Sequence, residues 1–190
     1  EANNNLKGEL FIEDLSLNLF RDFPNLSLGL EKVRYVGETP FEGLELFNIE
    51  EMSVELDLLS VFKGETIEIK RIQFLNPQIN VSVLADGTAN YLILKEDSTD
   101  VVEEDSETAP FKMALQRFTI TGLNLIYNDA ESDIFTEIKS GDFELKGDFT
   151  NTEVAINTVS SFKEFTVGMD QVNYFNKVSL FIFLVAVLEY

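Results

Sequence analysis

The most regular pattern in the sequence is an alternation of apolar and polar positions over residues 52–84. Apolar residues recur at every second position in three runs, at residues 52–56, 67–74 and 79–83, with a one-residue slip at Arg71. A period of two places the apolar side chains of a strand on one face and its polar side chains on the other. Such strands are typical of an antiparallel sheet with one dry and one solvated face. We predict that these residues form the centre of such a sheet.

Shorter runs of the same alternation occupy most of the remaining chain. Residues 6–20 and 26–36 are predicted to pair through a turn at Pro24, which fixes its own φ and restricts the residue before it. Further strands are predicted at residues 44–49, 113–127, 135–139, 143–149, 154–159, 165–169 and 172–188. The pattern therefore predicts an all-β fold in which one long twisted antiparallel sheet curves into a groove or half-barrel.

Three interruptions of the alternation predict local features of this sheet. Residues 58–62 are apolar without a period of two, which indicates one short helix packed against the sheet edge. Asn76 and Pro77 carry no tight hairpin signal, so we expect a bend or bulge within one long strand. Residues 85–88 contain Asp-Gly and predict a hairpin turn, after which residues 90–94 return as a strand.

Residues 96–110 differ in composition from the rest of the chain. They are acidic, lack aromatic residues and show no periodicity, so we predict a disordered linker between a first β-unit, residues 1–95, and a second, residues 111–190. The alternative is a calcium-binding loop, although the glycine and the ligand spacing of an EF-hand are missing. Its ligands would come from five acidic residues: Asp97, Asp100, Glu103, Glu104 and Asp105.

A weak internal repeat links the two predicted units. The pattern Φ-x-Φ-x-Arg-Φ-x-Φ, with Φ an apolar residue, occurs around Arg71 and again around Arg117. A break and a second Φ-x-Φ run follow in both copies; the break falls at Asn76 and Pro77 in the first and at Gly122 and Leu123 in the second. Such a repeat indicates one sheet extended by copies of a unit, and chance similarity of amphipathic strands is the alternative.

Composition argues against an enzyme and against a nucleic-acid-binding protein. The 190 residues include no His and no Cys, which removes the commonest general base, thiol nucleophiles and the usual zinc ligands. No nucleophile elbow or phosphate-binding loop is present. The net charge of −20 would repel a phosphate backbone and also an anionic lipid surface. We therefore predict a non-enzymatic protein without catalytic, cofactor-binding or metal-binding residues and without nucleic-acid partners.

The ends of the chain add two expectations. It begins at Glu1 rather than at Met and carries no signal peptide, so we expect a mature or trimmed product. The most apolar run, residues 178–188, is too short for a membrane-spanning helix, and its Val, Ile and Phe content favours a strand that is apolar on both faces.

Two stretches of the chain resemble the AsmA family of bacterial envelope proteins. Residues 15–30, LSLNLFRDFPNLSLGL, are similar to the opening strand pair of that family. Residues 41–90 carry its linked motifs in order, namely a Leu-rich turn ending in glycine, then Asn-Pro-x-Φ, then Asp-Gly-x-Ala-Asn. The variant RDFPNLSL and the acidic linker resemble the Bacteroidetes branch. The resemblance is good in the first half and loose in the second, and residues 179–188 are more apolar than the family pattern.

The resemblance implies a periplasmic protein that an N-terminal helix, absent from this sequence, tethers to the inner membrane. AsmA-like proteins are similar to TamB and to the chorein-type bridge proteins, which carry lipid along a β groove. The implied function is phospholipid handling or transport, or outer-membrane assembly, with a phospholipid or another acyl-chain ligand and envelope proteins as partners. No cofactor is implied.

An apolar sheet face that helices do not cover must close on itself, dimerise or hold a ligand. We predict that fourteen residues line an apolar groove for acyl chains: Leu15, Leu17, Leu26, Leu28, Val54, Leu56, Ile67, Ile69, Ile72, Phe74, Ile79, Val81, Phe118 and Ile120. The alternative is a structural or adhesion β-domain in which the same residues form a closed core and the partners are proteins bound at edge strands.

Overall fold

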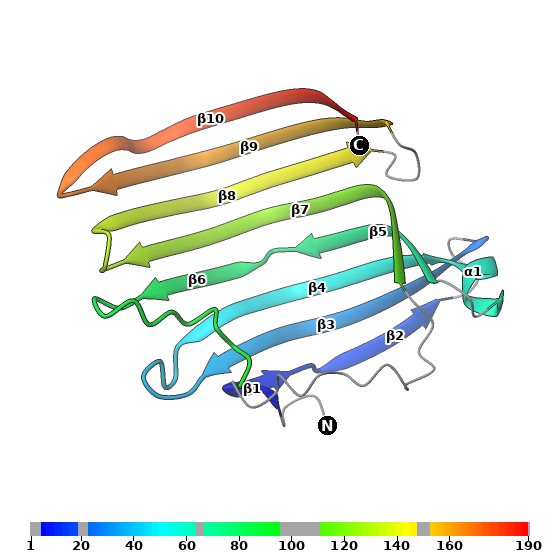
Figure 1. Ribbon diagram of the computed structural model, residues 1–190, viewed down its shortest axis with the longest axis horizontal. Coiled ribbons are helices and arrows are strands. Elements are labelled where there is room, and N and C mark those ends of the chain that lie inside the picture. Colours follow the sequence, from blue (N-terminus) through cyan, green and yellow to red (C-terminus); the bar gives the residue numbers. More distant parts are fainter. Residues whose placement is uncertain (1–4, 19–22, 64–66, 96–110, 148–152, 190) are drawn as a thin grey trace.

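The computed structural model describes residues 5–18, 23–63, 67–95, 111–147 and 153–189 (Figure 1). Ten strands form a single sheet, and one short helix, α1, follows the fourth strand. The strands are β1 (Gly8–Phe11), β2 (Asp14–Asn18), β3 (Asn25–Gly37), β4 (Glu45–Asp57), β5 (Ile67–Leu75), β6 (Gln78–Val83), β7 (Phe111–Asp129), β8 (Ile134–Gly147), β9 (Glu153–Met169) and β10 (Val172–Glu189), and the helix is α1 (Leu58–Lys63). The predicted linker, residues 96–110, lies outside the described residues.

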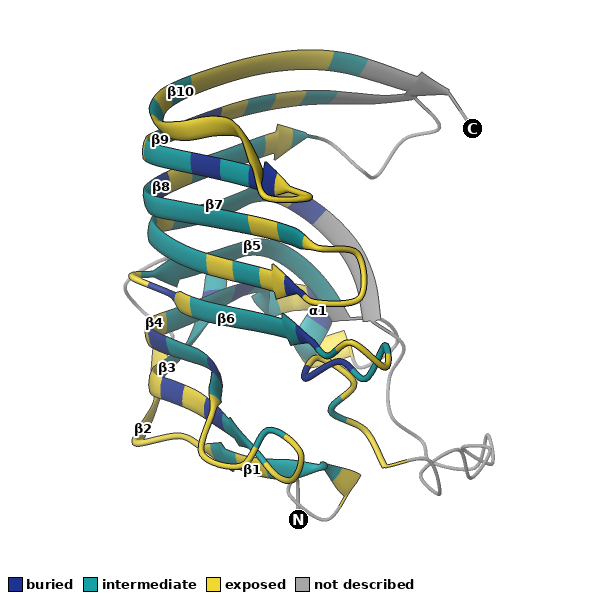
Figure 2. Cartoon of the chain, turned by 90° about the vertical axis from the view of Figure 1, so that its left-hand side faces the viewer, coloured by how far each residue is buried: buried dark blue, intermediate teal, exposed yellow. Residues whose placement is uncertain are grey.

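The sheet runs in the order β1-β3-β4-β5-β7-β8-β9-β10, with β2 beside β3 and with β6 between β4 and β7. Seen from the end, the strands follow an open curve, and both α1 and the segment of residues 84–95 lie on its concave side (Figure 2). The prediction of an all-β curved sheet with a short helix at residues 58–62 is confirmed. The sheet is mixed, however. β7 runs parallel to β5 and β6, whereas all other neighbouring strands that the structure describes are antiparallel.

The internal repeat of the sequence lies in these parallel strands. Arg71 pairs with Arg117, Phe74 with Ile120 and Ile79 with Leu125. Equivalent positions of the two copies therefore stand side by side, since parallel strands in register place equal side chains on the same face. The pairing of β5 with β7 departs from the alignment of the two repeat copies only before Arg71. A bulge there changes the register, so that Ile69 pairs with Met113.

Several strands are longer than the sequence pattern predicts. Two predicted breaks lie inside continuous strands at a single residue with positive φ, namely Gly122 in β7 and Ser140 in β8. Asn76 also has positive φ, but there β5 ends and β6 begins between the same two neighbouring strands. The predicted breaks inside β4 and β9 contain no residue with positive φ. A residue with positive φ inside a strand shifts the alternation by one position while the hydrogen-bonded ladder continues around it. The predicted strands at residues 135–139 and 143–149 therefore form one strand, β8, and Lys32 in β3 and Lys177 in β10 mark similar shifts.

Two other sequence-based predictions are wrong in detail. The expected strand over residues 6–20 is divided into β1 and β2, which pair with different halves of β3. The expected return strand at residues 90–94 does not form, and only a single bridge joins Ala89 to Val83. The side chain of Asn90 takes the place of a strand there, because it hydrogen bonds to the backbone of β6.

Apolar burial is greatest on β3 and β4 and where the segment of residues 84–95 covers the sheet. The most buried apolar residues are Leu26, Val33, Tyr35, Leu46, Ile49, Val83, Ala89 and Leu115. Much of the remaining apolar surface of the sheet is only half-buried.

Candidate functional site: an apolar trough on the concave face

Rows of apolar side chains cross the sheet from strand to strand. Cross-strand partners share a face, so the pairing register defines each row. One row consists of Leu15, Leu30, Met52, Phe74, Ile120 and Phe143. The next consists of Leu17, Leu28, Val54, Ile72, Phe118 and Leu145. A third, shorter row contains Leu26, Leu56 and Ile69.

The apolar rows continue on the same face beyond the positive-φ residues. In β3, β7 and β8 such a residue shifts the alternation by one, so the apolar positions on either side of it face the same way although their numbers differ in parity. The rows beyond these residues contain Phe47, Ile79, Leu125, Ile138 and Phe165, and then Val81 and Tyr127. β4 and β9 contain no positive-φ residue, and Phe47 and Phe165 join these rows through their partners Ile79 and Ile138. The structure thus places thirteen of the fourteen predicted groove residues in connected rows; the fourteenth, Ile67, pairs with Phe111, and its side chain lies outside the described set.

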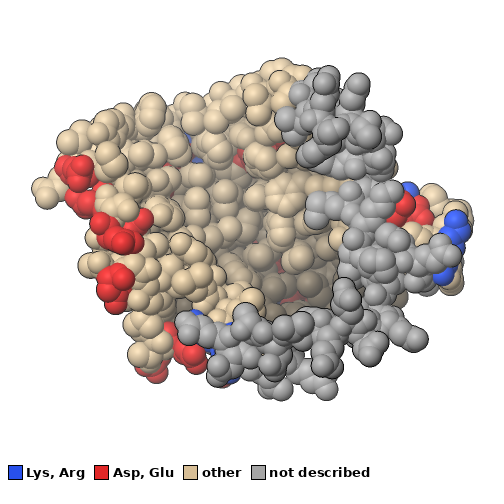
Figure 3. Space-filling view, in the orientation of Figure 1, with Lys and Arg blue, Asp and Glu red and all other residues tan. Residues whose placement is uncertain are grey.

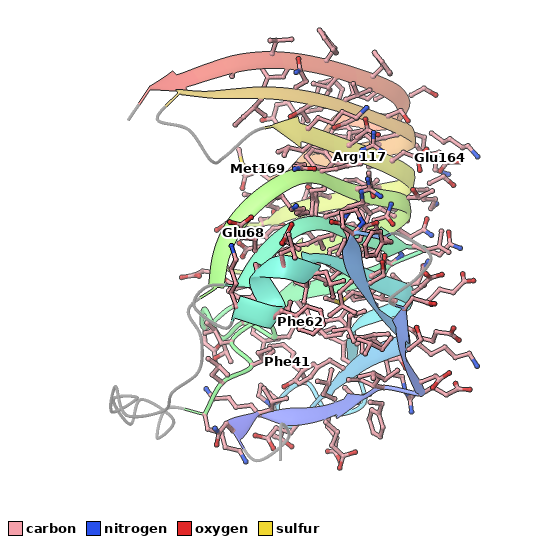
Figure 4. The ribbon with its side chains drawn as sticks, turned by 90° about the vertical axis from the view of Figure 1, so that its right-hand side faces the viewer. Phe41, Phe62, Glu68, Arg117, Glu164 and Met169 are labelled. Atoms are coloured by element: carbon pink, nitrogen blue, oxygen red, sulfur yellow. The ribbon has the colours of Figure 1, made fainter. Side chains whose placement is uncertain are left out.

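The charged side chains of the sheet alternate with these rows and point to the other face. Glu55 and Arg71 form an ion pair at 2.7 Å on neighbouring strands, and Ser53 donates a hydrogen bond to Gln73 at 3.3 Å. Glu164 points outward from the convex side of the sheet (Figure 4). The view onto the concave face shows a hollowed surface almost without Lys, Arg, Asp or Glu, and most acidic residues in that view lie at its edge (Figure 3). The apolar rows therefore line the hollow, which we call the trough.

The trough is not filled by the described part of the chain. Phe74, Phe118 and Phe143 pack edge to face with ring centroids 5.8 Å apart, yet all three stay half-buried. At one side of the sheet Leu15 and Leu17 remain 61% and 58% exposed. At the other side β10 is the last strand and exposes residues on both of its faces, including Phe181 at 68% and Ile182 at 43%. Apolar surface this continuous is unusual for a monomer, which makes the trough the candidate functional site.

A pocket of about 510 Å³ lies at one end of the trough, which we call the end pocket. Its lining includes Lys7, Tyr35, Glu38, Phe41, Asn90 and Lys95. This pocket could not be predicted from the sequence, because its walls come from three segments that are far apart in the chain. Backbone hydrogen bonds hold these segments together, from the N–H of Lys7 to the Ile93 carbonyl at 2.7 Å and from the N–H of Lys95 to the Asn5 carbonyl at 3.0 Å.

The structure offers little for other kinds of site. Among the described residues, no group of three or more His, Cys, Asp or Glu could hold a metal ion. The acidic residues of the alternative calcium loop lie outside the described residues. Of the helical residues that the structure describes, none belongs to a helix long and apolar enough to cross a bilayer.

Comparisons with known proteins add no relative. No family model matches the chain, and neither the curated proteins nor the solved structures contain a match.

Proposed function

We propose that this protein is a non-enzymatic module that holds acyl chains in its trough. The observation that carries the proposal is the hollowed concave face, on which connected apolar rows remain half-buried and almost no charged side chain appears. A ligand that fits such a surface is itself apolar and elongated. The charged residues on the convex face and at the rims favour solubility of the protein and leave the trough to a lipid.

Simple energetics favour this ligand class. Each buried methylene contributes roughly 0.8 kcal/mol, so an acyl chain laid along several strands binds without any dedicated polar site. The costs of immobilising the chain reduce the net affinity, but a preformed trough limits those costs to the ligand. A rigid sheet whose apolar rows already lie in register is preformed in this sense.

The resemblance to the AsmA family supports a cellular setting for the module. In this proposal the protein lies in the periplasm, is tethered to the inner membrane in its full-length form, and takes part in phospholipid transport or outer-membrane assembly. The open edge of the sheet at β10 favours a second candidate, a structural or adhesion β-domain that binds a protein strand there. In that case partners would pair with β10, and the trough would stay empty of lipid.

The experiment is native mass spectrometry of the protein purified from bacteria, combined with titration of a fluorescent fatty acid. We expect co-purified phospholipid and saturable fatty-acid binding. Replacing Ile72 in the trough by Gln should weaken that binding about tenfold, because an amide in contact with an acyl chain loses its water. Gln73 lies on the same strand and the opposite face, so Gln73→Ala is the matched control and should bind like the parent protein. A lipid-free protein whose two variants bind equally would refute the proposal.

A further inference from the structure

The two edges of the sheet differ in length. One edge consists of β1 and β2, which have four and five residues and carry the acidic residues Glu9 and Asp14. Short, charged strands are a common protection of a sheet edge against pairing with another chain. The other edge is β10, which has 18 residues and pairs only with β9 among the described strands (Figure 1). The edge at β10 is therefore long and open.

The edge at β10 also differs in charge from the rest of the chain. The sequence contains 34 Asp and Glu residues, but none of them falls between residues 171 and 188. The charged residues of β10 are Lys177 and Glu189, which lie toward its two ends. Two copies with a net charge of −20 each therefore repel one another less at this edge than an even distribution of charge would cause.

The middle of β10 is an exposed run of five consecutive apolar residues, with exposed fractions between 43% and 68%. The run consists of Phe181, Ile182, Phe183, Leu184 and Val185. The residues that flank the run, at positions 180 and 186, are half-buried. The exposed run is therefore centred on Phe183.

A ligand in the trough would cover only part of this run. Ile182 lies in the row of Phe143, so the even-numbered residues of the run face the trough. Phe183 lies in the row of Glu144, so the odd-numbered residues face the convex side. A further strand beside β10 would bring new neighbours to both faces at once, and it would also pair with the backbone groups of the open edge.

We propose that β10 pairs with β10 of a second copy of this chain. The two strands run antiparallel about a twofold axis that passes Phe183 and is normal to the sheet. Residues at equal distances before and after Phe183 then lie opposite each other. Phe183 faces its own equivalent, and the other four residues of the run face one another in two kinds of pair, Phe181 with Val185 and Ile182 with Leu184. Every exposed residue of the run thereby gains an apolar cross-strand neighbour.

The charges of β10 support the same register. Lys177 stands six residues before Phe183 and Glu189 six residues after it, so the proposed pairing places each opposite the other. Opposite charges at facing positions stabilise a strand pair, whereas like charges destabilise it. A bulge between Val178 and Leu180 displaces Lys177 by about one residue, a distance that a lysine side chain spans. The exposed run and the two charges are independent observations, and they give the same centre.

A twofold pairing also closes after two copies. Pairing of β10 with the β1 and β2 edge of another copy would be head-to-tail and would continue into a filament. The short acidic strands of that edge oppose such growth, whereas β10 is complementary to itself. The pairing does not depend on the proposed function, because the two strands can meet with or without an acyl chain in the trough. The axis normal to the sheet keeps both troughs on the same side of the joined sheet.

The test is disulfide cross-linking at β10, together with analytical ultracentrifugation of the parent protein. The sequence has no Cys, so one introduced cysteine reports on one position. Facing residues of antiparallel strands have Cα atoms about 4.5–5.5 Å apart, which a disulfide can span. Phe183→Cys should therefore form a covalent dimer under mild oxidation. Val185→Cys is the matched control and should not, because its two equivalents lie four residues apart along the strands, about 13 Å.

A lysine at the axis tests the same interface without a covalent bond. Phe183→Lys places two like charges opposite each other and should weaken self-association about a hundredfold. Tyr174→Lys makes the same change of charge at a 60% exposed aromatic residue of the same strand, outside the paired residues, and should associate like the parent protein. Circular dichroism of both variants verifies that the fold is intact.

Charge reversal tests the register separately from the net charge. Lys177→Glu and Glu189→Lys should each weaken association about threefold, and the double variant should restore it. Glu189→Lys changes the net charge from −20 to −18, so repulsion between whole copies alone would make this variant associate more tightly. Tighter association of Glu189→Lys would overturn the proposed register.

The parent protein must form dimers for the proposal to stand. A protein that stays monomeric at every concentration would overturn it and leave β10 to a strand of another protein. Equal cross-linking of Phe183→Cys and Val185→Cys, or a dimer that Phe183→Lys does not weaken, would place the interface elsewhere. Assemblies that grow beyond two copies would overturn the closed pairing.

Discussion

Asn90 and Ser82 exchange two hydrogen bonds across the turn that ends β6. The N–H of Asn90 donates to the Ser82 carbonyl at 3.0 Å, and the N–H of Ser82 donates to Asn90 Oδ1 at 2.9 Å. Asn90 Nδ2 also donates to the Asn80 carbonyl at 2.7 Å. Asn90 is 7% exposed. Its side chain supplies hydrogen-bond partners to the backbone of β6 beyond the residues that pair with β4. The same contacts hold the segment of residues 84–95 against β6.

Replacing Asn90 by Ala should lower the free energy of unfolding by about 2–3 kcal/mol, because it leaves a donor and an acceptor of β6 buried without partners. Asn90→Asp keeps the acceptor for the Ser82 N–H but places a buried carboxylate oxygen against the Asn80 carbonyl, so at pH 7 it should cost at least as much as Asn90→Ala. Urea denaturation followed by circular dichroism measures both. If Asn90→Ala cost no more than about 0.5 kcal/mol, the contacts would not hold the segment, since that is the usual range of neutral surface changes.

The strands of this fold could be predicted from sequence because their signal is local. The alternation around Ile72 and Phe118 is visible without knowing which strands meet, and the repeat around Arg71 and Arg117 even contains their register. Their parallel direction could not be predicted, because it depends on the path between β6 and β7. Single positive-φ residues such as Ser140 were predicted as strand ends, since a shift of alternation looks the same in sequence whether or not the ladder continues.

The candidate site also has one part that can be predicted from the sequence and one part that cannot. The trough residues were predicted because an apolar row is the sum of the local patterns of its strands. The end pocket was not, because Lys7, Glu38 and Lys95 meet only through long-range contacts. The lysines at positions 7 and 95 carry no signal in the sequence, because their proximity depends on how the segments are placed.

The ion pair between Glu55 and Arg71 predicts a salt-dependent effect on stability. The side chain of Glu55 is only 10% exposed, and Arg71 stands beside Arg117 in the parallel pair. Glu55→Gln should therefore cost about 1–3 kcal/mol, below the value for a fully buried pair because Arg71 is 37% exposed. Added NaCl should recover part of the loss by screening the two arginines.

The matched control for Glu55 is Glu45, which pairs with Arg34 at 3.1 Å and is more exposed. Glu45→Gln should change the free energy of unfolding by less than about 0.5 kcal/mol. Equal effects of the two substitutions, or a Glu55→Gln loss that salt does not alter, would contradict the interpretation of Glu55 as the carboxylate that offsets the charge of two neighbouring arginines.

Asp57 links α1 to the sheet and predicts a dependence on pH. Its carboxylate accepts the Ser60 N–H at 2.8 Å and pairs with Lys70 on β5. The hydrogen bond from Lys70, followed by that from the Ser60 backbone, lowers the pKa of Asp57 below its ordinary value. In the unfolded chain the carboxyl takes up its proton at a higher pH. The contribution to stability is therefore complete above the ordinary Asp value near 3.9 and is lost as the pH falls through the lowered pKa.

Asp57→Asn keeps an acceptor for the first turn of α1 and removes the charge that pairs with Lys70. We expect it to cost about 1 kcal/mol at pH 7. The difference between parent and variant should shrink as the pH falls below about 4. Thermal unfolding at a series of pH values measures this. A difference that stays constant down to pH 2 would show that the charge on Asp57 contributes nothing.

Gly43 and Gly122 require glycine for different reasons: Gly43 for its backbone conformation alone, and Gly122 also because a side chain would have no space. Both have positive φ, +73° and +76°, a region that costs other residues roughly 1–2 kcal/mol. A Cβ on Gly43 would meet nothing within 4 Å, whereas a Cβ on Gly122 would overlap with Oδ1 of Asn76, which links β5 to β6. Asn76 has little freedom to move away, because its Nδ2 donates to Glu50 at 2.6 Å and its N–H donates to the Thr121 carbonyl at 2.8 Å.

Gly43→Ala should therefore cost about 1 kcal/mol, the backbone cost alone, and Gly122→Ala about 2–4 kcal/mol, because the contact with Asn76 is added to it. Urea denaturation of both variants isolates the difference, since the backbone cost is common to them. The double variant Gly122→Ala with Asn76→Ala should recover part of the loss by removing the overlapping oxygen. Equal costs for the two glycine substitutions would mean that the Asn76 side chain turns aside freely and that its contact with Gly122 does not add to the backbone cost.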